Sequence, residues 1–527
     1  MFDLKNLSAN GHQQLLVASI VTVATGLGVY YALAPSKKYT LDEKAIYRAI
    51  PVPKSRLPYF GHLFSLGELP GNTVTKWNEE LGPIIQLDMG QQTWIVLSDP
   101  KLAHEIFMTN GALTSDRPPH TFFDFFSHGG IGVVFSNANK NWKKSRTSVL
   151  SVLAPSRVNE FTDLLLYETD NMVNELLGRT SRYGQLNSLT TINACALNVV
   201  LTIIFGRRVT SADDPFLEEL MKYIEPTLKY AGVEGSLSQH IPAFGFVDSL
   251  FGKKRIFRDF IANVRDPLFR RLIREAAAGD RDCLVKDYME LDFEELDLIV
   301  ILSDLLAAGT DTISVTLSWL IVILSHHPHV QKKLHEEIDA FVDAHGRLPT
   351  FEERDQVPYL VCVQKECMRY RSTSFFGLPH TTREDVVIRD YMFPKGTVLL
   401  ANMKAMHMNP DVYDDPETFK PERFMDRTRT MYASANGNVD KRDHYNFGFG
   451  RRICPGIHMA EVEMYHACTR IFGRCVIAPP LDASGNEVPI DIDAAVNCGV
   501  VVSPAPFEVR FLPRTDSPLN TLSPPLV

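Results

Sequence analysis

The stretch Phe447–Gly456, which reads FGFGRRICPG, decides how the rest of the chain is interpreted. Its glycines and Pro455 predict a tight loop around Cys454, with a helix beginning directly after it. We expect the helix N-terminus and the neighbouring Arg452 to favour the thiolate form of Cys454 by lowering the pKa of the thiol. A thiolate is the ligand that pushes electron density into heme iron and favours O–O cleavage. The stretch therefore predicts a thiolate that could serve as a ligand to heme iron.

Two other interpretations of this stretch are weaker. A structural zinc site needs more cysteine or histidine residues at short spacing, and none lies nearby. The GFG string at 448–450 lacks the strand–turn–helix unit of a dinucleotide-binding loop. The pattern F-x-x-G-x-R-x-C-x-G resembles the heme-binding signature of the cytochrome P450 superfamily. The resemblance implies that Cys454 is the axial iron ligand and that Phe447 also contacts the heme.

A second string, AGTDT at 308–312, lies in the middle of the predicted apolar helix 292–325. Gly309 would let a flat ligand or dioxygen approach the backbone, and Thr312 lies three residues on, on the same face. A mid-helix Thr hydroxyl can turn toward a ligand or water, and Asp311 can relay protons from solvent. The alternative is an N-cap pair in an interrupted helix. The string matches the family's acid–alcohol pair, to which the resemblance assigns proton delivery to dioxygen.

The resemblance also implies roles for a group of ion-pairing residues and for the residues around the heme propionates. Glu366 and Arg369 form the only E-x-x-R in the chain, which unaided would be an ordinary helical ion pair. Their order along the chain matches the family's buried Glu–Arg–Arg network, with Arg423 as the third member and a structural role. The residues expected at the heme propionates, where arginine suits a carboxylate, are Trp142, Arg146, His380 and Arg452. Unaided, Trp142 and Arg146 could be a surface cation–π pair.

Two stretches are long and apolar enough to cross a membrane. Residues 15–34 carry no charge and would span about 30 Å as a helix. Lys37 and Lys38 follow them, which favours a signal-anchor that leaves the body on the cytosolic face of the endoplasmic reticulum over a buried helix. Residues 305–324 have an acid at their centre and follow charged first turns, so we expect a helix buried in protein there.

Composition describes a globular protein of 527 residues, with 45% hydrophobic and 22% charged residues. The net charge of −9 gives no basic excess for nucleic-acid binding. Eight cysteines without a CxxC pattern favour a reducing compartment over a disulfide scaffold. A hairpin at 84–97 and helical periods predict a mainly α fold with a small β portion, and the resemblance implies the cytochrome P450 fold. The predicted helices are 156–178, 190–205, 215–231, 254–278, 292–325, 328–345 and 358–371, with a further helix after 456. We expect a short non-cytosolic N-terminus at 1–14, the transmembrane anchor at 15–34, a Pro-rich linker at 35–62, the catalytic domain at 63–512 and a mobile tail at 513–527.

The motifs and segment lengths look most like those of fungal microsomal members of the family. This resemblance also implies the reaction. Such a protein binds heme b and inserts one oxygen atom from O2 into a lipophilic molecule, such as a steroid, terpenoid, fatty-acyl or aromatic metabolite. Its electrons come from NADPH through a membrane-bound reductase, with cytochrome b5 as a further partner. The alternatives are a heme-thiolate isomerase or dehydratase without external electrons, or a membrane-tethered heme sensor. Candidate cations for docking the reductase are Lys143, Lys144, Lys441, Arg442 and Arg451.

Aromatic residues gather in two stretches, 122–126 and 375–376. Both fall where the family places pocket-lining segments, although clusters of aromatic side chains form core more often than pocket. With Leu305, Ala308 and Val500 they suggest a lipophilic, nearly uncharged cavity.

Overall fold

The computed structural model describes residues 47–232, 237–241, 252–291, 293–427 and 429–522. The predicted membrane anchor and the N-terminal segment before it lie outside these residues. Within the described residues, helices dominate, and the strands form one four-stranded and three two-stranded sheets. The predicted fold class, mainly α with a small β portion, is confirmed for this part of the chain.

The long helices lie close to their predicted ranges. They are α8 (Leu189–Phe205), α9 (Pro215–Tyr230), α15 (Glu295–Ser325), α16 (Pro328–His345), α17 (Pro358–Tyr370) and α20 (Ile457–Arg474). Two predicted helices are interrupted: the first becomes α6 (Pro155–Glu160) and α7 (Thr162–Tyr183), and the second becomes α12 (Lys253–Phe260), the π-helical turn η3 (Ile261–Arg265) and α13 (Asp266–Ala278).

Shorter helices connect these elements. They are α2 (Pro70–Leu81), α3 (Pro100–His104), η1 (Glu105–Thr109), α4 (Thr121–Phe126), α5 (Lys140–Val152), α10 (Leu237–His240), α14 (Leu284–Met289), η4 (Phe351–Gln356), α18 (Met403–His407), η5 (Pro421–Phe424), α19 (Met431–Ala435), η6 (Val439–Lys441), η7 (Gly450–Arg452) and α21 (Leu519–Leu522).

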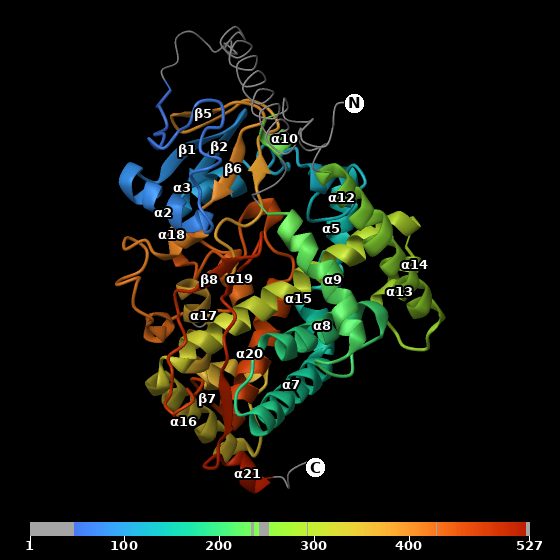
Figure 1. The fold of residues 1–527 in the computed structure, drawn as a ribbon, viewed down its shortest axis with the longest axis vertical. Coiled ribbons are helices and arrows are strands. Elements are labelled where there is room, and N and C mark those ends of the chain that lie inside the picture. The colour runs from blue at the N-terminus through green and yellow to red at the C-terminus, as the bar shows by residue number, and fades with distance from the viewer. Residues whose placement is uncertain (1–46, 233–236, 242–251, 292, 428, 523–527) are drawn as a thin grey trace, which may run out of the picture.

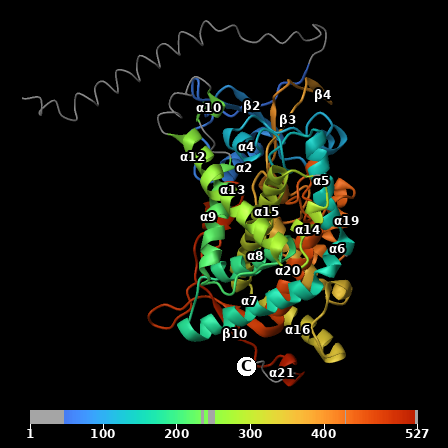
Figure 2. The same ribbon diagram turned by 90° about the vertical axis from the view of Figure 1, so that its right-hand side faces the viewer.

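Helix α15 runs through the middle of the molecule, with α8, α9 and α20 beside it (Figures 1 and 2). It begins at a capping box, in which Glu294 and Asp297 each accept a hydrogen bond from the other's backbone N–H. Beyond the first turns nearly all of its side chains are buried. It is the one helix in the described residues whose length and composition would suit a membrane span, and 72% of that span is buried inside the protein. The prediction of a protein-buried helix is therefore confirmed.

The largest sheet has the strand order β1-β2-β6-β3. β1 (Ile84–Met89) and β2 (Gln92–Leu97) form the predicted hairpin, with Ile84 opposite Leu97. β6 (Val398–Ala401) pairs in parallel with β2, and β3 (His380–Thr381) pairs antiparallel with β6. This pairing brings segments about three hundred residues apart to one end of the molecule, opposite α16 and α21 (Figure 2). The short paired strands are β4 (Val386–Ile388) with β5 (Tyr391–Phe393), β7 (Cys475–Ala478) with β10 (Arg510–Pro513), and β8 (Ala495–Asn497) with β9 (Val502–Pro504).

The end of the chain is packed further than predicted. Arg514 is 4% exposed, and its guanidinium donates two hydrogen bonds to Asp339, at 2.9 and 2.5 Å. Ser517 is also buried, and α21 follows it. The prediction of a mobile tail from residue 513 is therefore wrong for residues 513–517. A buried arginine with a carboxylate partner 175 positions earlier is not visible in a Pro-rich local sequence.

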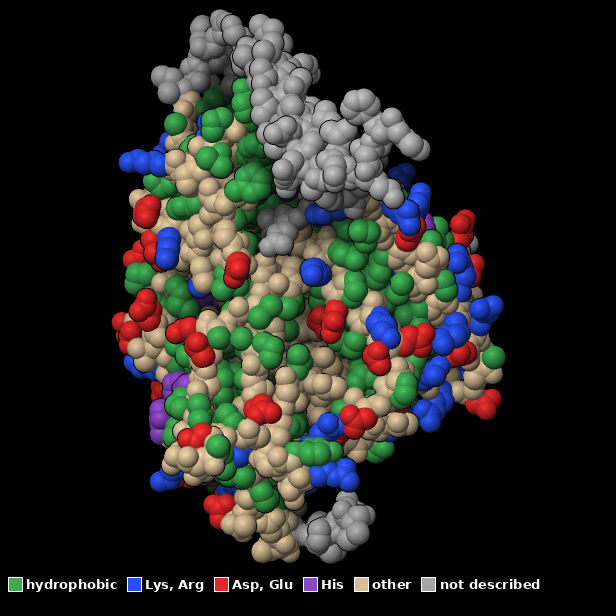
Figure 3. Space-filling model, in the orientation of Figure 1, with side chains coloured by type: hydrophobic (Ala, Val, Ile, Leu, Met, Phe, Trp, Pro, Cys, Tyr) green, Lys and Arg blue, Asp and Glu red, His purple; other side chains and the backbone are tan. Residues whose placement is uncertain are grey.

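The surface carries both signs of charge. On the face drawn in Figure 3, acidic and basic side chains alternate, including along the edge formed by α12, α13 and α14. No large field of one sign dominates this face, as expected from the modest net charge.

Candidate active site

One cavity of about 380 Å³ joins most of the residues that the sequence singles out. Helix α15 forms one wall, and the loop before α20, with Phe447 and Cys454, forms another. The residues around the cavity are mainly apolar, among them Val133, Leu305 and Val500. The volume lies within the range of about 300–1,000 Å³ typical of pockets for small molecules and cofactors. We therefore treat this cavity as the candidate active site.

The Cys454 loop is held by its own backbone and by a close neighbour. Cys454 N–H donates to the Phe447 carbonyl at 2.9 Å, which closes the loop. Gly450 has φ +61°, and a Cβ there would lie 2.0 Å from the Phe107 carbonyl oxygen, so only glycine fits. Helix α20 then begins at Ile457, as the sequence predicted.

The electrostatics of the Cys454 thiol differ from the prediction. Burial raises the pKa of the thiol, and the Gly456 N–H and the Arg146 charge lower it only in part. The N–H at the start of α20 thus lowers the pKa as predicted, but the cation that acts on the thiol is Arg146 on α5 and not Arg452. The net direction differs from the prediction because burial of the thiol outweighs both effects. Coordination to a metal ion deprotonates a thiol outright, so the site still suits a thiolate ligand.

Three guanidinium groups line the same cavity: Arg117, Arg146 and Arg452. Among the described residues none of them donates a hydrogen bond to a carboxylate, although the charges of Asp304 and Asp116 act on Arg117 and Arg452 respectively. Each donates instead to backbone carbonyls, as when Arg117 Nη1 donates to Pro379 O at 2.8 Å and Arg452 Nε to Ser115 O at 2.9 Å. Burial and then the neighbouring Arg146 lower the pKa of Arg117 to about 9. Burial and then Arg117 and Arg146 lower the pKa of Arg452 to about 8.

Such a cluster favours an anion with more than one acidic group. The two propionates of heme supply this, beside a thiol that can become an axial ligand. The described residues therefore fit the heme that the resemblance implies: Cys454 would supply the iron ligand, and the guanidinium groups would hold the propionates. Arg117 was missed by the sequence analysis, since no local motif marks it.

Of the other two residues expected at the propionates, His380 lines the cavity and Trp142 lies behind its lining. Trp142 is buried outside the cavity lining, and its Nε1 donates to Val133 O at 3.1 Å. The Arg452 guanidinium stacks 4.5 Å from the Trp142 ring. His380 lines the cavity, with its Nδ1 2.9 Å from Thr114 O. Burial, then the charge of Arg117, hold the pKa of His380 well below its usual range, so His380 is a neutral hydrogen-bonding group.

We expect Arg117→Gln to release heme at least about tenfold faster than the unaltered protein, because it removes a charge-assisted hydrogen bond. Heme transfer to apomyoglobin, followed by absorbance, measures the rate. Arg117→Lys keeps the charge and should restore most of the retention. Arg383→Gln is the matched control, because Arg383 already pairs with Asp116 at 2.8 Å on the surface. An unchanged rate in Arg117→Gln would remove Arg117 from the heme site.

The two residues of the acid–alcohol pair at 311–312 have different surroundings. Thr312 lines the cavity, and its hydroxyl donates to Ala308 O at 2.8 Å. Asp311 does not line the cavity; burial, then the charge of Glu225 on α9, raise its pKa to about 7. The acid and the alcohol are thus adjacent in sequence, with the alcohol facing the cavity and the acid poised to hold or release a proton near neutral pH.

Gly309 was predicted to let a ligand or dioxygen approach the backbone, but the structure gives another reason for a glycine here. It lines the cavity, but a Cβ on it would lie 2.8 Å from Val200 Cγ2 of α8. The missing side chain therefore allows close packing of α8 against α15, and any approach of a ligand comes in addition.

The aromatic stretches are mostly core, which the sequence left open. Phe122, Phe123 and Phe126 are at most 2% exposed, and their rings pack against Phe135. Only Phe135 of this cluster lines the cavity. In the second stretch Phe376 lines the cavity, whereas Phe375 packs outside it.

The predicted Glu–Arg–Arg network is confirmed on the thiolate side of the fold. Arg369 Nε donates to Glu366 Oε2 at 2.7 Å, and Arg423 Nε donates to Glu366 Oε1 at 3.0 Å. Glu366 and Arg369 are fully buried, and Lys420 N–H adds a further donor to the carboxylate. The Glu366 carboxylate therefore joins α17 to η5, while Arg369 Nη1 also donates to His407 O at 2.9 Å.

Four of the five candidate docking cations are exposed: Lys143, Lys144, Lys441 and Arg451. The fifth, Arg442, is 3% exposed and donates to Gly448 O at 2.9 Å. It therefore supports the Cys454 loop from inside, and its assignment to the docking surface is wrong.

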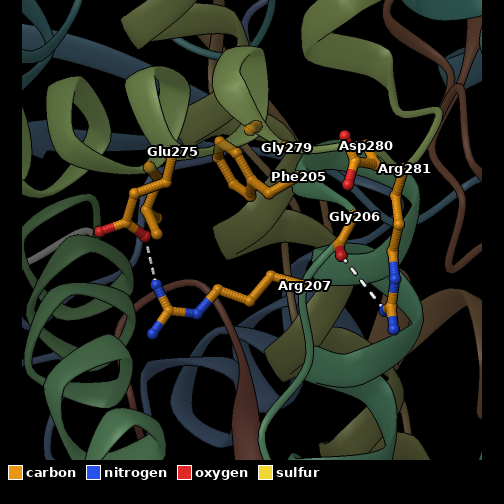
Figure 4. A pocket seen from close by; sticks show the side chains of 9 residues that line it. Phe205, Gly206, Arg207, Glu275, Gly279, Asp280 and Arg281 are labelled. Atoms are coloured by element: carbon orange, nitrogen blue, oxygen red, sulfur yellow. Dashed lines mark hydrogen bonds and ion pairs between the residues drawn. The ribbon is translucent and has the colours of Figure 1, made fainter.

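A second cavity, of about 330 Å³, lies between the end of α8 and the end of α13 (Figure 4). Its cations are already engaged, since Arg207 pairs with Glu275 and Arg281 Nη1 donates to Gly206 O at 3.3 Å. It contains none of the residues that the motifs marked, so we assign it no chemistry.

Comparisons with known proteins point to one family. A family model described as Cytochrome P450 matches residues 51–511. Cytochrome P450 monooxygenase verH of Penicillium polonicum is 28% identical over 87% of this chain and 88% of its own length. Cytochrome P450 monooxygenase anuE of Penicillium roqueforti is 28% identical over 84% of this chain and 92% of its own length. The solved structure of a zebra fish cytochrome P450 with abiraterone superposes with a TM-score of 0.68 at 25% identity, covering 84% of this chain and 100% of that one.

Proposed function

The chain belongs to the cytochrome P450 family of monooxygenases, and on that premise we propose that it inserts one oxygen atom from O2 into a lipophilic small molecule. The electrons come from NADPH through a membrane-bound reductase, with cytochrome b5 as a further partner. The observation that carries the proposal is the cavity that joins Cys454, Thr312 and three guanidinium groups that donate to no carboxylate among the described residues. A steroid, terpenoid, fatty-acyl or aromatic metabolite would suit its apolar lining.

Each part of the cavity has a role in this reaction. Bound heme would supply the iron at which dioxygen is activated. Cys454 would provide the axial sulfur, and Arg117, Arg146 and Arg452 would neutralise the two propionates. The apolar walls exclude water and orient the substrate. Thr312 holds a hydroxyl at the cavity wall, and Asp311 exchanges protons with solvent near neutral pH.

The acid–alcohol pair favours a monooxygenase over the two alternatives. A heme-thiolate isomerase or dehydratase takes up no external electrons and a heme sensor turns nothing over, so neither has a use for proton delivery. The test is NADPH consumption by the purified, heme-loaded protein with a fungal reductase, during a screen of lipophilic metabolites. Substrate-dependent consumption supports the proposal, and conversion of a substrate without NADPH would establish an isomerase or dehydratase instead.

Asp311→Asn is expected to lower the rate of product formation by about 100-fold, because general acid–base groups contribute at least this much to a reaction rate. In the unaltered protein this rate should fall as pH rises through about 7, where Asp311 loses its proton. In Asp311→Asn this fall should be absent. Glu225→Gln is the matched variant: without the neighbouring charge the pKa of Asp311 falls, so the decline should move to lower pH. A pH profile that is identical in all three proteins would exclude Asp311 from proton delivery.

We also propose that the predicted anchor at 15–34 holds the domain on the cytosolic face of the endoplasmic reticulum. Directly behind it, four large apolar side chains are exposed between residues 52 and 64: Val52, Leu57, Tyr59 and Phe64, at 36–63%. Exposed apolar side chains this close to an anchor suit contact with a membrane interface.

A further inference from the structure

Asp304 is a buried acid in the cavity wall that the roles above do not use. It lies on α15, four residues before Ala308 and eight before Thr312, and all three side chains line the cavity. The spacing of four places them on one stripe of the helix. Asp304 is 5% exposed.

The two carboxylate oxygens of Asp304 have different surroundings. Oδ2 accepts hydrogen bonds from Val133 N–H at 2.7 Å and Val134 N–H at 3.2 Å. Oδ1 is buried and accepts no hydrogen bond from the described residues. Leaving a buried charged acceptor unpaired is unfavourable, and a donor on a bound molecule would remove that penalty.

The charge state of Asp304 suits an acceptor. Burial raises its pKa to about 6, against the lowering effect of the two N–H donors and of Arg265 and Arg117. At neutral pH the carboxylate is therefore mainly ionised. With two guanidinium groups already acting on Asp304, its negative charge is compensated, so a neutral donor suits it better than a cation.

Among the described residues, Asp304 is the one carboxylate that α15 contributes to the cavity lining. The hydroxyls on this wall already have backbone partners: Thr312 donates to Ala308 O, and Thr316 donates to Thr312 O and is 2.8 Å from the Thr373 hydroxyl. The other unpaired buried oxygens in the lining belong to Asn446 and Glu463, on the segments around Cys454. On the substrate side of the cavity, Asp304 is thus the charged acceptor with an unpaired oxygen, and a charged acceptor forms a stronger hydrogen bond than a hydroxyl.

We propose that Asp304 is a specificity-determining residue whose Oδ1 accepts a hydrogen bond from a hydroxyl group on a neutral, otherwise apolar substrate. This inference rests on the proposed function, since it concerns the substrate of the same site. The helical rise puts Asp304 about 12 Å from Thr312 along α15. The hydroxyl therefore binds at the opposite end of the substrate from the carbon that reacts.

The test uses 1-alkylimidazoles of graded chain length, each ending in a hydroxyl or in a methoxy group. The imidazole coordinates the heme iron, so a shift of the Soret band reports binding without turnover. At the chain length that reaches Asp304, we expect the hydroxyl probe to bind about tenfold more tightly than the methoxy probe, because only the hydroxyl can donate to a carboxylate.

Asp304→Asn is the informative variant. Its amide oxygen can keep the bonds from Val133 and Val134, while its amide N–H2 takes the place of Oδ1 and donates to either probe. We therefore expect the two probes to bind to this variant with about equal affinity. The binding of 1-butylimidazole, which is too short to reach residue 304, should stay unchanged and shows that the cavity is intact.

Three results would overturn the inference: no hydroxyl preference at any chain length, a preference that persists in Asp304→Asn, or tighter binding of a probe that ends in an ammonium group. A different failure belongs to the proposed function. If no imidazole shifts the Soret band of the unaltered, heme-loaded protein, the heme-thiolate cavity itself is misassigned.

Discussion

Cys454→Ala is expected to abolish the red-shifted, thiolate-type Soret band of the reduced, carbon-monoxide-treated protein, and monooxygenase turnover with it. The reason is the position of Cys454 within the cavity lining, in a loop closed by the bond from Cys454 N–H to Phe447 O at 2.9 Å. Among the described residues, Cys454 is the one cysteine in that lining, so no other thiol can replace it. Without the sulfur, the electron donation that favours O–O cleavage is lost.

The measurement is the absorption spectrum of purified protein with its heme content determined independently. Cys475→Ala is the matched control, since Cys475 is also a free, buried cysteine but starts β7, outside the cavity lining. The control should keep the band. A thiolate-type band that survives in folded Cys454→Ala would show that another residue binds the iron, and the proposed function would then be wrong.

Glu366→Ala is expected to give the largest loss of stability, with little folded, heme-loaded protein recovered. Its carboxylate is fully buried and accepts from Arg369, Arg423 and the Lys420 backbone. Removing one partner of a buried pair leaves uncompensated charge and costs about 3–5 kcal/mol. This is a large part of the free energy of unfolding of an ordinary protein, about 5–15 kcal/mol.

Thermal unfolding and heme content together measure this effect. Glu160→Ala is the matched control, because Glu160 also pairs with an arginine three residues away, at 2.7 Å, but both side chains are about half exposed. Its unfolding midpoint should scarcely change, since exposed ion pairs contribute little. Equal midpoints for Glu366→Ala and Glu160→Ala would show that the buried network does not stabilise the fold.

Local patterns were sufficient to predict much of the fold and the centre of the site. The hairpin at 84–97, the long buried helix and the loop around Cys454 each depend on neighbours in sequence, so period, charge and turn residues reveal them. The Glu–Arg–Arg network was predicted because the order of its motifs along the chain matched a known family. In each case the information lies in residues that are close together in sequence, or in the order of short motifs along the chain.

The errors concern contacts between distant segments. Arg117 reaches the cavity because its guanidinium bonds to Leu378 and Pro379, some 260 positions away. Gly309 is small because Val200 of another helix packs against it. The Cys454 thiol has a raised pKa because the fold buries it, although its neighbours in sequence suggested the opposite. Burial and partners of this kind are properties of the tertiary structure, so no local pattern contains them.

The cluster of Arg117, Arg146 and Arg452 has a consequence for how the protein matures. Three cations that meet in a buried space repel one another, and the nearby carboxylates of Asp304 and Asp116 offset this only in part, since the pKa values of Arg117 and Arg452 remain lowered. In the newly made chain this repulsion destabilises the folded form. The propionates of bound heme would remove it, in addition to the bond between Cys454 and the iron. Binding of this kind stabilises the folded form by mass action. We therefore expect the supply of heme to set not only how active the protein is but also how much folded protein accumulates in the cell.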